Sequence, residues 1–360
     1  MKDNYLLHND TAKKLYWDYA KDLPVIALCS DPSPSDKIYN NVAEAFLLND
    51  TFKLQAMREY GIDEKYITGD ASDYEKFKAF CSILPDYAGN SINLLSHIEI
   101  RYNFQCFIDI SLETCDEIWA YCNEYIINNH ITEKYLTEKA NVTAVGCLEI
   151  DTFVSSLYLR RDIEDLGMLE NIIKQEISKA YTNGIKNAIL TLGDDFFKPN
   201  SYTASEVYKK LLLRQSELTY EEFRLLSIQL IRDMGIYCKE TSWTWLYEYY
   251  EPSHELLTYL EKNNALPSIN PIYLFNIFDT EDEVELDIRN ISAQSCLGKT
   301  ICTVDFSSIE SAYARNDYLR RVICNLIGKW VENGEYASNE KVLKNLIEDV
   351  LYNNIKEAIK

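Results

Sequence analysis

Histidine and cysteine side chains carry out much of the metal-binding and proton-transfer chemistry of proteins. This chain has four histidines and ten cysteines. The scarcity of histidine limits any metal-centred or acid–base mechanism. We expect His8 and His97 to make structural hydrogen bonds, and His130 and His254 to be solvated. The cysteines include no C-x-x-C pair, so free thiols are expected rather than a disulfide framework.

The elements that must position such residues alternate along the chain. Short apolar runs predict strands over 25–29, 142–147, 154–159, 188–192, 243–247, 272–276 and 300–304. Helices are predicted as a group from 35 to 130, and then over 163–177, 207–213, 220–234, 319–330 and 342–351. This alternation indicates a parallel sheet covered on both faces, and about seven strands favour a (β/α) barrel over an open sheet. We predict one domain, 1–360, with a helical insertion subdomain over 35–130.

Composition narrows the function classes. There are 57 acidic and 36 basic side chains among 360 residues, giving a net charge of 36 − 57 = −21. So negative a chain lacks the basic surface that nucleic acids and anionic membranes require. No basic-then-apolar leader pattern and no apolar run of membrane-spanning length is visible. We therefore expect a cytoplasmic protein with neither nucleic-acid nor membrane partners.

Several segments, in order, resemble the uronate isomerase (glucuronate/galacturonate isomerase) family of the amidohydrolase superfamily. They are 8–24, 57–73, 89–90, 97–99, 114–119, 318–328, 330–336 and 352–354. The first 150 and the last 55 residues are covered well and the middle weakly. Members of that family are longer than this chain, so the resemblance identifies it as a divergent, shortened relative.

The resemblance implies an α/β fold, a distorted (β/α)8 TIM-type barrel of the metal-dependent hydrolase kind, with the loss of one strand left open. It also implies the family reaction, an aldose–ketose isomerisation of D-glucuronate to D-fructuronate or of D-galacturonate to D-tagaturonate. Proton transfer between C1 and C2 needs a base and a group that polarises the carbonyl, and the family uses one divalent metal such as zinc. Relatives of this kind suggest a homo-oligomer that binds a small sugar acid.

The chain departs from the family where the metal should bind. The family has two histidines separated by one residue at the end of the first strand, where side chains two apart point the same way. Cys29 and Asp31 occupy these places, and both residue types can ligate a metal. The alternative is that Cys29 is a buried thiol and Asp31 caps the next turn.

Other polar clusters of the family are also replaced. The segment over 49–55 has lost a histidine, a tyrosine hydroxyl and an arginine. Asp305 lies one residue from the family's last metal-ligand aspartate, and the arginine that should follow is absent. Arg160 is a candidate for binding a substrate carboxylate, but the sequence favours the alternative that it belongs to the surface start of a helix capped by Asp162. Scaffold segments are therefore retained while the reacting groups are lost.

Three interpretations follow from this pattern. The leading one is a catalytically degenerate family member, a pseudoenzyme for which no cofactor is expected. The second is an active uronate isomerase with a rebuilt site, in which Cys29, Asp31 and Asp305 are the catalytic or metal-binding candidates and Arg160 binds substrate. The third is a non-catalytic sugar-acid binding or regulatory protein. Metal content and turnover distinguish the first two.

Overall fold

The computed structural model describes residues 3–29, 33–159, 163–190, 204–212, 219–248, 254–275, 280–294, 296–304 and 309–360. Two compact units divide the chain. Unit 1 comprises Met1–Ala144 and Leu274–Asn354, and unit 2 comprises Val145–Tyr273 and Ile355–Lys360. Each unit is described by itself below.

Six strands form one sheet in which spatial order follows chain order. They are β1(Val25–Cys29), β2(Val142–Glu149), β3(Asn187–Leu190), β4(Thr244–Glu248), β5(Ser268–Phe275) and β6(Ile301–Val304). The pairings of β2 with β3, β3 with β4 and β4 with β5 are parallel. In unit 1 the first and last strands meet, because the Thr303 hydroxyl donates to the carbonyl oxygen of Ile26 at 3.0 Å. The prediction of a distorted TIM-type barrel is confirmed, with six strands in the described part of the chain.

One predicted strand is wrong. Residues 154–159 belong to a helix, α8(Ile150–Leu159), which follows directly on β2. The short apolar run fits either structure by composition. Ile150, Val154 and Leu157 are buried at helical spacing, so tertiary packing selects the helix. The other strands lie where the sequence predicts them, although β5 begins at Ser268, before the predicted start at 272.

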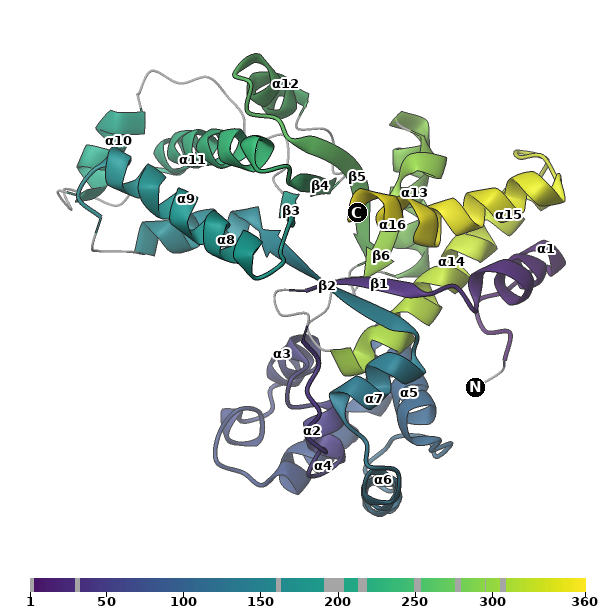
Figure 1. Cartoon of the computed structure of the whole chain (residues 1–360). Coiled ribbons are helices and arrows are strands. Elements are labelled where there is room, and N and C mark those ends of the chain that lie inside the picture. The colour runs from purple at the N-terminus through teal and green to yellow at the C-terminus, as the bar shows by residue number, and fades with distance from the viewer. Residues whose placement is uncertain are drawn as a thin grey trace. The chain divides into compact units, whose positions relative to one another are not determined.

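Unit 1 contains the helices inserted between β1 and β2, together with those that flank β6 (Figure 1). They are α1(Asp10–Lys14), α2(Val42–Phe46), α3(Thr51–Tyr60), α4(Asp73–Ile83), α5(Ser91–Phe104), α6(Cys115–Asn129), α7(Glu133–Lys139), α13(Glu281–Gln294), α14(Ala312–Glu332) and α15(Glu340–Glu348). A π-helical turn, η1(Leu15–Ala20), continues α1, and another, η7(Asp349–Asn353), continues α15. A 3₁₀ turn, η6(Ile309–Ser311), precedes α14.

Local sequence signals set the ends of these helices. Asp50 caps the start of α3 by accepting hydrogen bonds from two backbone amides, and Gly61 ends it with a left-handed φ of 94°. Ser72 and Glu75 form a capping box at the start of α4. The helices α2 to α6 then pack around one apolar core that includes Phe46, Phe77 and Phe80.

Unit 2 packs α8, α9(Leu166–Thr182), α10(Ala204–Leu212), α11(Tyr220–Glu240) and α12(His254–Lys262) around β3 and β4. A last helix, α16(Asn354–Ala358), ends the chain. Trp243 and Trp245 are fully buried in this core. The core of unit 2 is therefore separate from that of the helices inserted in unit 1.

No described helix is long and apolar enough to cross a membrane. All nine described cysteines are free thiols, as the sequence predicts, and eight of them are buried. Burial raises the pKa of Cys81, Cys302 and Cys324, so these thiols remain protonated.

Candidate functional site

Active sites of barrels of this type lie at the carboxyl ends of the strands. Cys29 is the last residue of β1, but its side chain lies outside the described part of the structure. Asp31, Arg160 and Asp305 also lie outside the described residues. The structure therefore places β1 and β6, at whose ends Cys29, Asp31 and Asp305 were predicted, while Arg160 follows the helix α8 and not a strand. The roles of the four remain predictions.

Unit 1 contains a group of five buried, charged side chains, which we call the buried charge cluster: Asp50, Lys53, Glu99, Glu310 and Arg315. They come from the N-cap and first turn of α3, from α5, from η6 and from the start of α14. Two of these elements, η6 and α14, follow β6 along the chain. Each of the five side chains is at most 6% exposed, so the cluster is shielded from water.

Lys53 lies at the centre of the buried charge cluster. Its Nζ is 2.7 Å from Glu99 Oε2 and 3.4 Å from Asp50 Oδ2. The same nitrogen donates to the carbonyl oxygen of Phe46 at 2.6 Å and stands 3.8 Å from the centre of the Phe46 ring. One ammonium group thus holds two carboxylates and a main-chain carbonyl, with every contact desolvated.

The two acids that flank Lys53 have opposite pKa shifts. Burial by itself raises the pKa of Asp50, but the charges of Lys53 and Arg315 and the amide of Lys53 outweigh it and lower the pKa. Burial raises the pKa of Glu99 to about 7; Lys53 opposes this shift, and the neighbouring charge of Asp50 adds to it. Asp50 therefore stays ionised, while Glu99 holds a proton over much of the range below neutrality.

A pH-dependent stability follows from Glu99. Its pKa of about 7 in the folded chain exceeds the ordinary glutamate value of 4.5, so the folded chain keeps a proton that the unfolded chain releases. The contribution to stability is therefore full below about pH 4.5 and is lost as the pH rises to about 7, by about 3 kcal/mol in total. Glu99→Gln is expected to flatten this slope in urea unfolding between about pH 5 and about pH 8. Glu64→Gln is the matched control, because Glu64 is exposed and paired with Arg58, and an unchanged slope in Glu99→Gln would contradict the assignment.

The remaining members fix η6 and the start of α14. Glu310 accepts a hydrogen bond from the Tyr39 hydroxyl at 2.5 Å, and burial raises its pKa. The side-chain amide of Asn103 donates to the main-chain oxygen of Glu310 at 2.9 Å. Arg315 Nη2 lies 3.2 Å from Asp50 Oδ2. The buried charge cluster thus ties α3 and α5 to η6 and the start of α14, and its chemistry is positioning.

The sequence analysis missed this cluster. The one indication in the sequence was the spacing of Asp50 and Lys53, three residues apart in the segment 49–55. The sequence analysis considered that segment for the reactive groups it has lost. The partners of this pair, Glu99, Glu310 and Arg315, are far away along the chain. Spacing within a segment does not reveal pairs that only the tertiary fold creates.

The described histidines have structural contacts. Both ring nitrogens of His97 are engaged by the backbone, Nδ1 with the Asn93 oxygen at 2.8 Å and Nε2 with the Ile110 amide at 2.9 Å. The His8 amide donates to Asn325 Oδ1 at 3.0 Å, while its side chain is 65% exposed. His130 is exposed at the end of α6 in a left-handed conformation. The expectations for these three are confirmed, and the His254 side chain lies outside the described part.

The sequence model of the glucuronate isomerase family matches residues 1–170 and 271–358. The chain belongs to this family. The uronate isomerase of Caldanaerobacter subterraneus is 28% identical and that of Bacillus subtilis 25%, each alignment covering 99% of this chain and 98% or 97% of the relative.

Among solved structures, the uronate isomerase of Thermotoga maritima superposes with a TM-score of 0.77 at 19% identity, covering 100% of this chain and 99% of the other. The glucuronate isomerase of Caulobacter crescentus superposes with a TM-score of 0.79 at 14% identity, covering 100% of this chain and 96% of the other. Both structures therefore share the fold of this chain.

This glucuronate isomerase family member is shorter than its relatives, and its middle is unmatched by the family model. The alignment with the Caldanaerobacter protein spans 464 positions, so at least 464 − 360 = 104 of them face a gap in this chain. The family model leaves residues 171–270 unmatched, and these residues all belong to unit 2. The sequence-based expectation of a shortened relative with a divergent middle is confirmed.

The residues present do not fit the two-histidine metal site that the family resemblance implies. At the end of β1 the donors are the Cys29 thiol and the Asp31 carboxylate. His97 has both nitrogens occupied by backbone, and His8 and His130 lie on other elements. Within the described ranges, no three His, Cys, Asp or Glu side chains come together as metal ligands would. We derive no reaction step through a metal.

Proposed function

We propose that this chain is a glucuronate isomerase-family protein that does not carry out the family's isomerisation. The observation that carries the proposal is the replacement of the histidine pair at the end of β1 by Cys29 and Asp31. The His97 ring, engaged through both nitrogens, cannot supply a missing ligand without breaking its hydrogen bonds to the backbone.

The first turn of α3 supports the same conclusion. Phe52 stands where the family has a tyrosine, so no hydroxyl is available there. The Phe52 ring lies 4.9 Å from the guanidinium carbon of Arg315, which places it against the buried charge cluster. A hydroxyl that could donate a proton has therefore been replaced by a ring that packs against a buried cation.

The remaining role that we propose is binding or regulation in the cytoplasm, with a small sugar acid as ligand and with assembly into a homo-oligomer. The net charge of −21 argues against nucleic-acid or anionic-membrane partners. A member of an enzyme family can keep a fold that recognises the ligand after it has lost the groups that react with it.

Metal content and turnover test this proposal. Protein purified from cells grown with zinc and manganese is expected to contain less than one metal ion per chain, and to turn over neither glucuronate nor galacturonate with any added divalent metal. Asp31→Asn should leave both results unchanged. The matched control is Asp36→Asn, since Asp36 is an exposed acid of the same loop region, paired with Lys134 at 3.2 Å. Stoichiometric metal and turnover, both lost in Asp31→Asn and kept in Asp36→Asn, would establish an active isomerase with a rebuilt site instead.

A further inference from the structure

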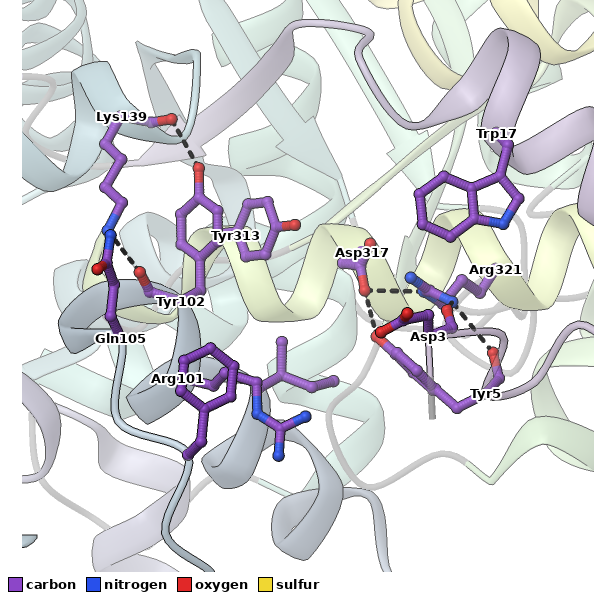
Figure 2. Close-up of a pocket in the computed structure, with 12 residues that line it drawn as sticks. Asp3, Tyr5, Trp17, Arg101, Tyr102, Gln105, Lys139, Tyr313, Asp317 and Arg321 are labelled. Carbon is purple, nitrogen blue, oxygen red and sulfur yellow. Dashed lines mark hydrogen bonds and ion pairs between the residues drawn. The ribbon is translucent and has the colours of Figure 1, made fainter. Parts of the chain in front are cut away.

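Unit 1 contains a cavity that the proposed function does not use. Its volume is about 360 Å³, within the range of small-molecule sites. It is formed by the N-terminal segment, η1, α5 and the residues after it, α7 and α14 (Figure 2). The lining side chains are Asp3, Tyr5, Trp17, Ile98, Arg101, Tyr102, Gln105, Phe107, Lys139, Tyr313, Asp317 and Arg321. None of these belongs to the buried charge cluster.

One wall of the cavity contains an ion pair whose charges balance. Asp317 accepts hydrogen bonds from the hydroxyls of Tyr5 and Tyr16, and from Arg321 Nε at 2.9 Å. The Arg321 guanidinium lies 3.9 Å from the Tyr5 ring centre and donates to the Asp3 carbonyl at 2.8 Å. Because Asp317 and Arg321 satisfy each other, the charge left on this wall is that of the Asp3 carboxylate.

The opposite wall is positively charged. Lys139 Nζ donates to the carbonyl oxygens of Tyr102 at 2.5 Å and Asn103 at 3.3 Å, and an ammonium group has three donors. Burial lowers the pKa of Lys139, so an anion beside it would stabilise the charged form. The lining contains three basic side chains, Lys139, Arg101 and Arg321, and two acidic ones, Asp3 and Asp317. Its net charge is therefore 3 − 2 = +1, although the whole chain has a net charge of −21.

Aromatic rings form the rest of the surface. Phe107 is 68% exposed and Trp17 39%, although both are large apolar side chains. The Arg101 guanidinium carbon lies 5.1 Å from the Phe107 ring centre, so charge and ring surface occur side by side. Behind them the rings of Tyr102 and Tyr313 stack with their planes 6° apart, and Figure 2 shows the two rings face to face.

From this combination we infer that the cavity binds a small ring-bearing carboxylic acid. The carboxylate is held by Arg101, and the flat face of the ring packs against Phe107, whose ring centre lies 5.1 Å from the Arg101 guanidinium carbon. Both a pyranose acid and an aromatic acid have this chemistry. The lining includes none of the candidates Cys29, Asp31, Arg160 and Asp305. The inference therefore does not depend on whether the chain retains isomerase activity.

Calorimetric titration of the full chain tests the inference, with glucuronate and galacturonate as the pyranose probes and benzoate and 4-hydroxybenzoate as the aromatic ones. Saturable binding at millimolar concentration or better is expected for one class, with the corresponding uncharged alcohols at least tenfold weaker. Whichever class binds identifies the source of the ligand. No saturable binding by either class would overturn the inference.

Variants locate the binding. Arg101→Gln and Phe107→Ala are each expected to weaken binding at least tenfold while circular dichroism stays native. Arg289→Gln is the matched control, because Arg289 also stands over an aromatic ring, that of Trp330 at 5.3 Å, but away from the cavity lining. Equal affinity in Arg101→Gln and Arg289→Gln would overturn the inference. The inference would also be overturned if the protein were a dimer that bound no acid and that Phe107→Ala dissociated. The cavity surface would then be a contact between two copies of the chain.

Discussion

Replacing Lys53 with methionine is expected to destabilise the folded chain by about 3–5 kcal/mol, the usual effect of breaking a buried ion pair by removing one partner. Lys53 Nζ contacts Glu99 and Asp50 at 2.7 and 3.4 Å, and its side chain is 1% exposed. Without it, the ionised Asp50 retains Arg315 as a cation, but Glu99 has lost its ion-pair partner in a desolvated site. Urea unfolding of the full chain near neutral pH measures the loss.

Two further variants identify the cause of that loss. The double variant Lys53→Met with Glu99→Leu is expected to be more stable than Lys53→Met alone, because no buried Glu99 carboxyl group is then left without its hydrogen-bond partner. Lys13→Met is the matched control, since Lys13 is an exposed lysine paired with Asp10 at 2.8 Å, and it should change stability by less than about 1 kcal/mol. If Lys53→Met lost no more than Lys13→Met, the buried charge cluster would not be stabilising the fold.

Much of the fold of this chain could be predicted from local pattern. Strands such as β1 and β6 are short, largely apolar runs, and α14 has apolar residues at helical spacing along its length. The failure at α8 has a physical reason. The ten residues of α8 include four aliphatic and two aromatic side chains, a composition that is compatible with either a strand or a helix. Only the burial of Ile150, Val154 and Leu157 at helical spacing decides for the helix.

The candidate site could be predicted only in part. Cys29, Asp31 and Asp305 could be proposed because strand ends are visible in the sequence and the family resemblance marks them. The pair of Asp50 with Arg315 spans 265 positions, and that of Tyr39 with Glu310 spans 271. No periodicity connects residues so far apart, since only the tertiary fold brings η6 and α14 against the helices inserted after the first strand.

The start of α14 connects the two polar regions of unit 1. Arg315 faces the buried charge cluster, while Tyr313, Asp317 and Arg321, at i, i+4 and i+8, line the cavity. Successive residues of a helix turn by about 100°, so one short stretch can serve both sides. A change on one face is thus expected to leave the other intact unless it unfolds the helix, which makes Asp317 a separate test from Lys53.

Asp317→Asn is expected to lower stability by about 3–5 kcal/mol, because Arg321, itself nearly buried, loses the carboxylate that balances its charge. The hydroxyls of Tyr5 and Tyr16 lose a charged acceptor at the same time. Burial acting alone would lower the pKa of Arg321, yet Asp317 raises it above its ordinary value, as expected for a pair that depends on its acid. Urea unfolding measures the loss, and Asp10→Asn, at an exposed acid paired with Lys13, is the control with an expected change below about 1 kcal/mol.

Hydrogen exchange distinguishes this loss from a general weakening of α14. Arg321 donates to the carbonyl oxygens of Asp3 and Tyr5, at 2.8 and 3.3 Å, so Asp317 fixes the N-terminal segment through Arg321. In Asp317→Asn the amides around Tyr5 should exchange faster, while those around Lys53 keep the protection they have in the wild-type chain. Faster exchange at both places, or at neither, would contradict the separation of the two faces. Since Asp3 and Tyr5 also form part of the cavity wall, binding of a ring acid should weaken in the same variant without any change in the cation that holds its carboxylate.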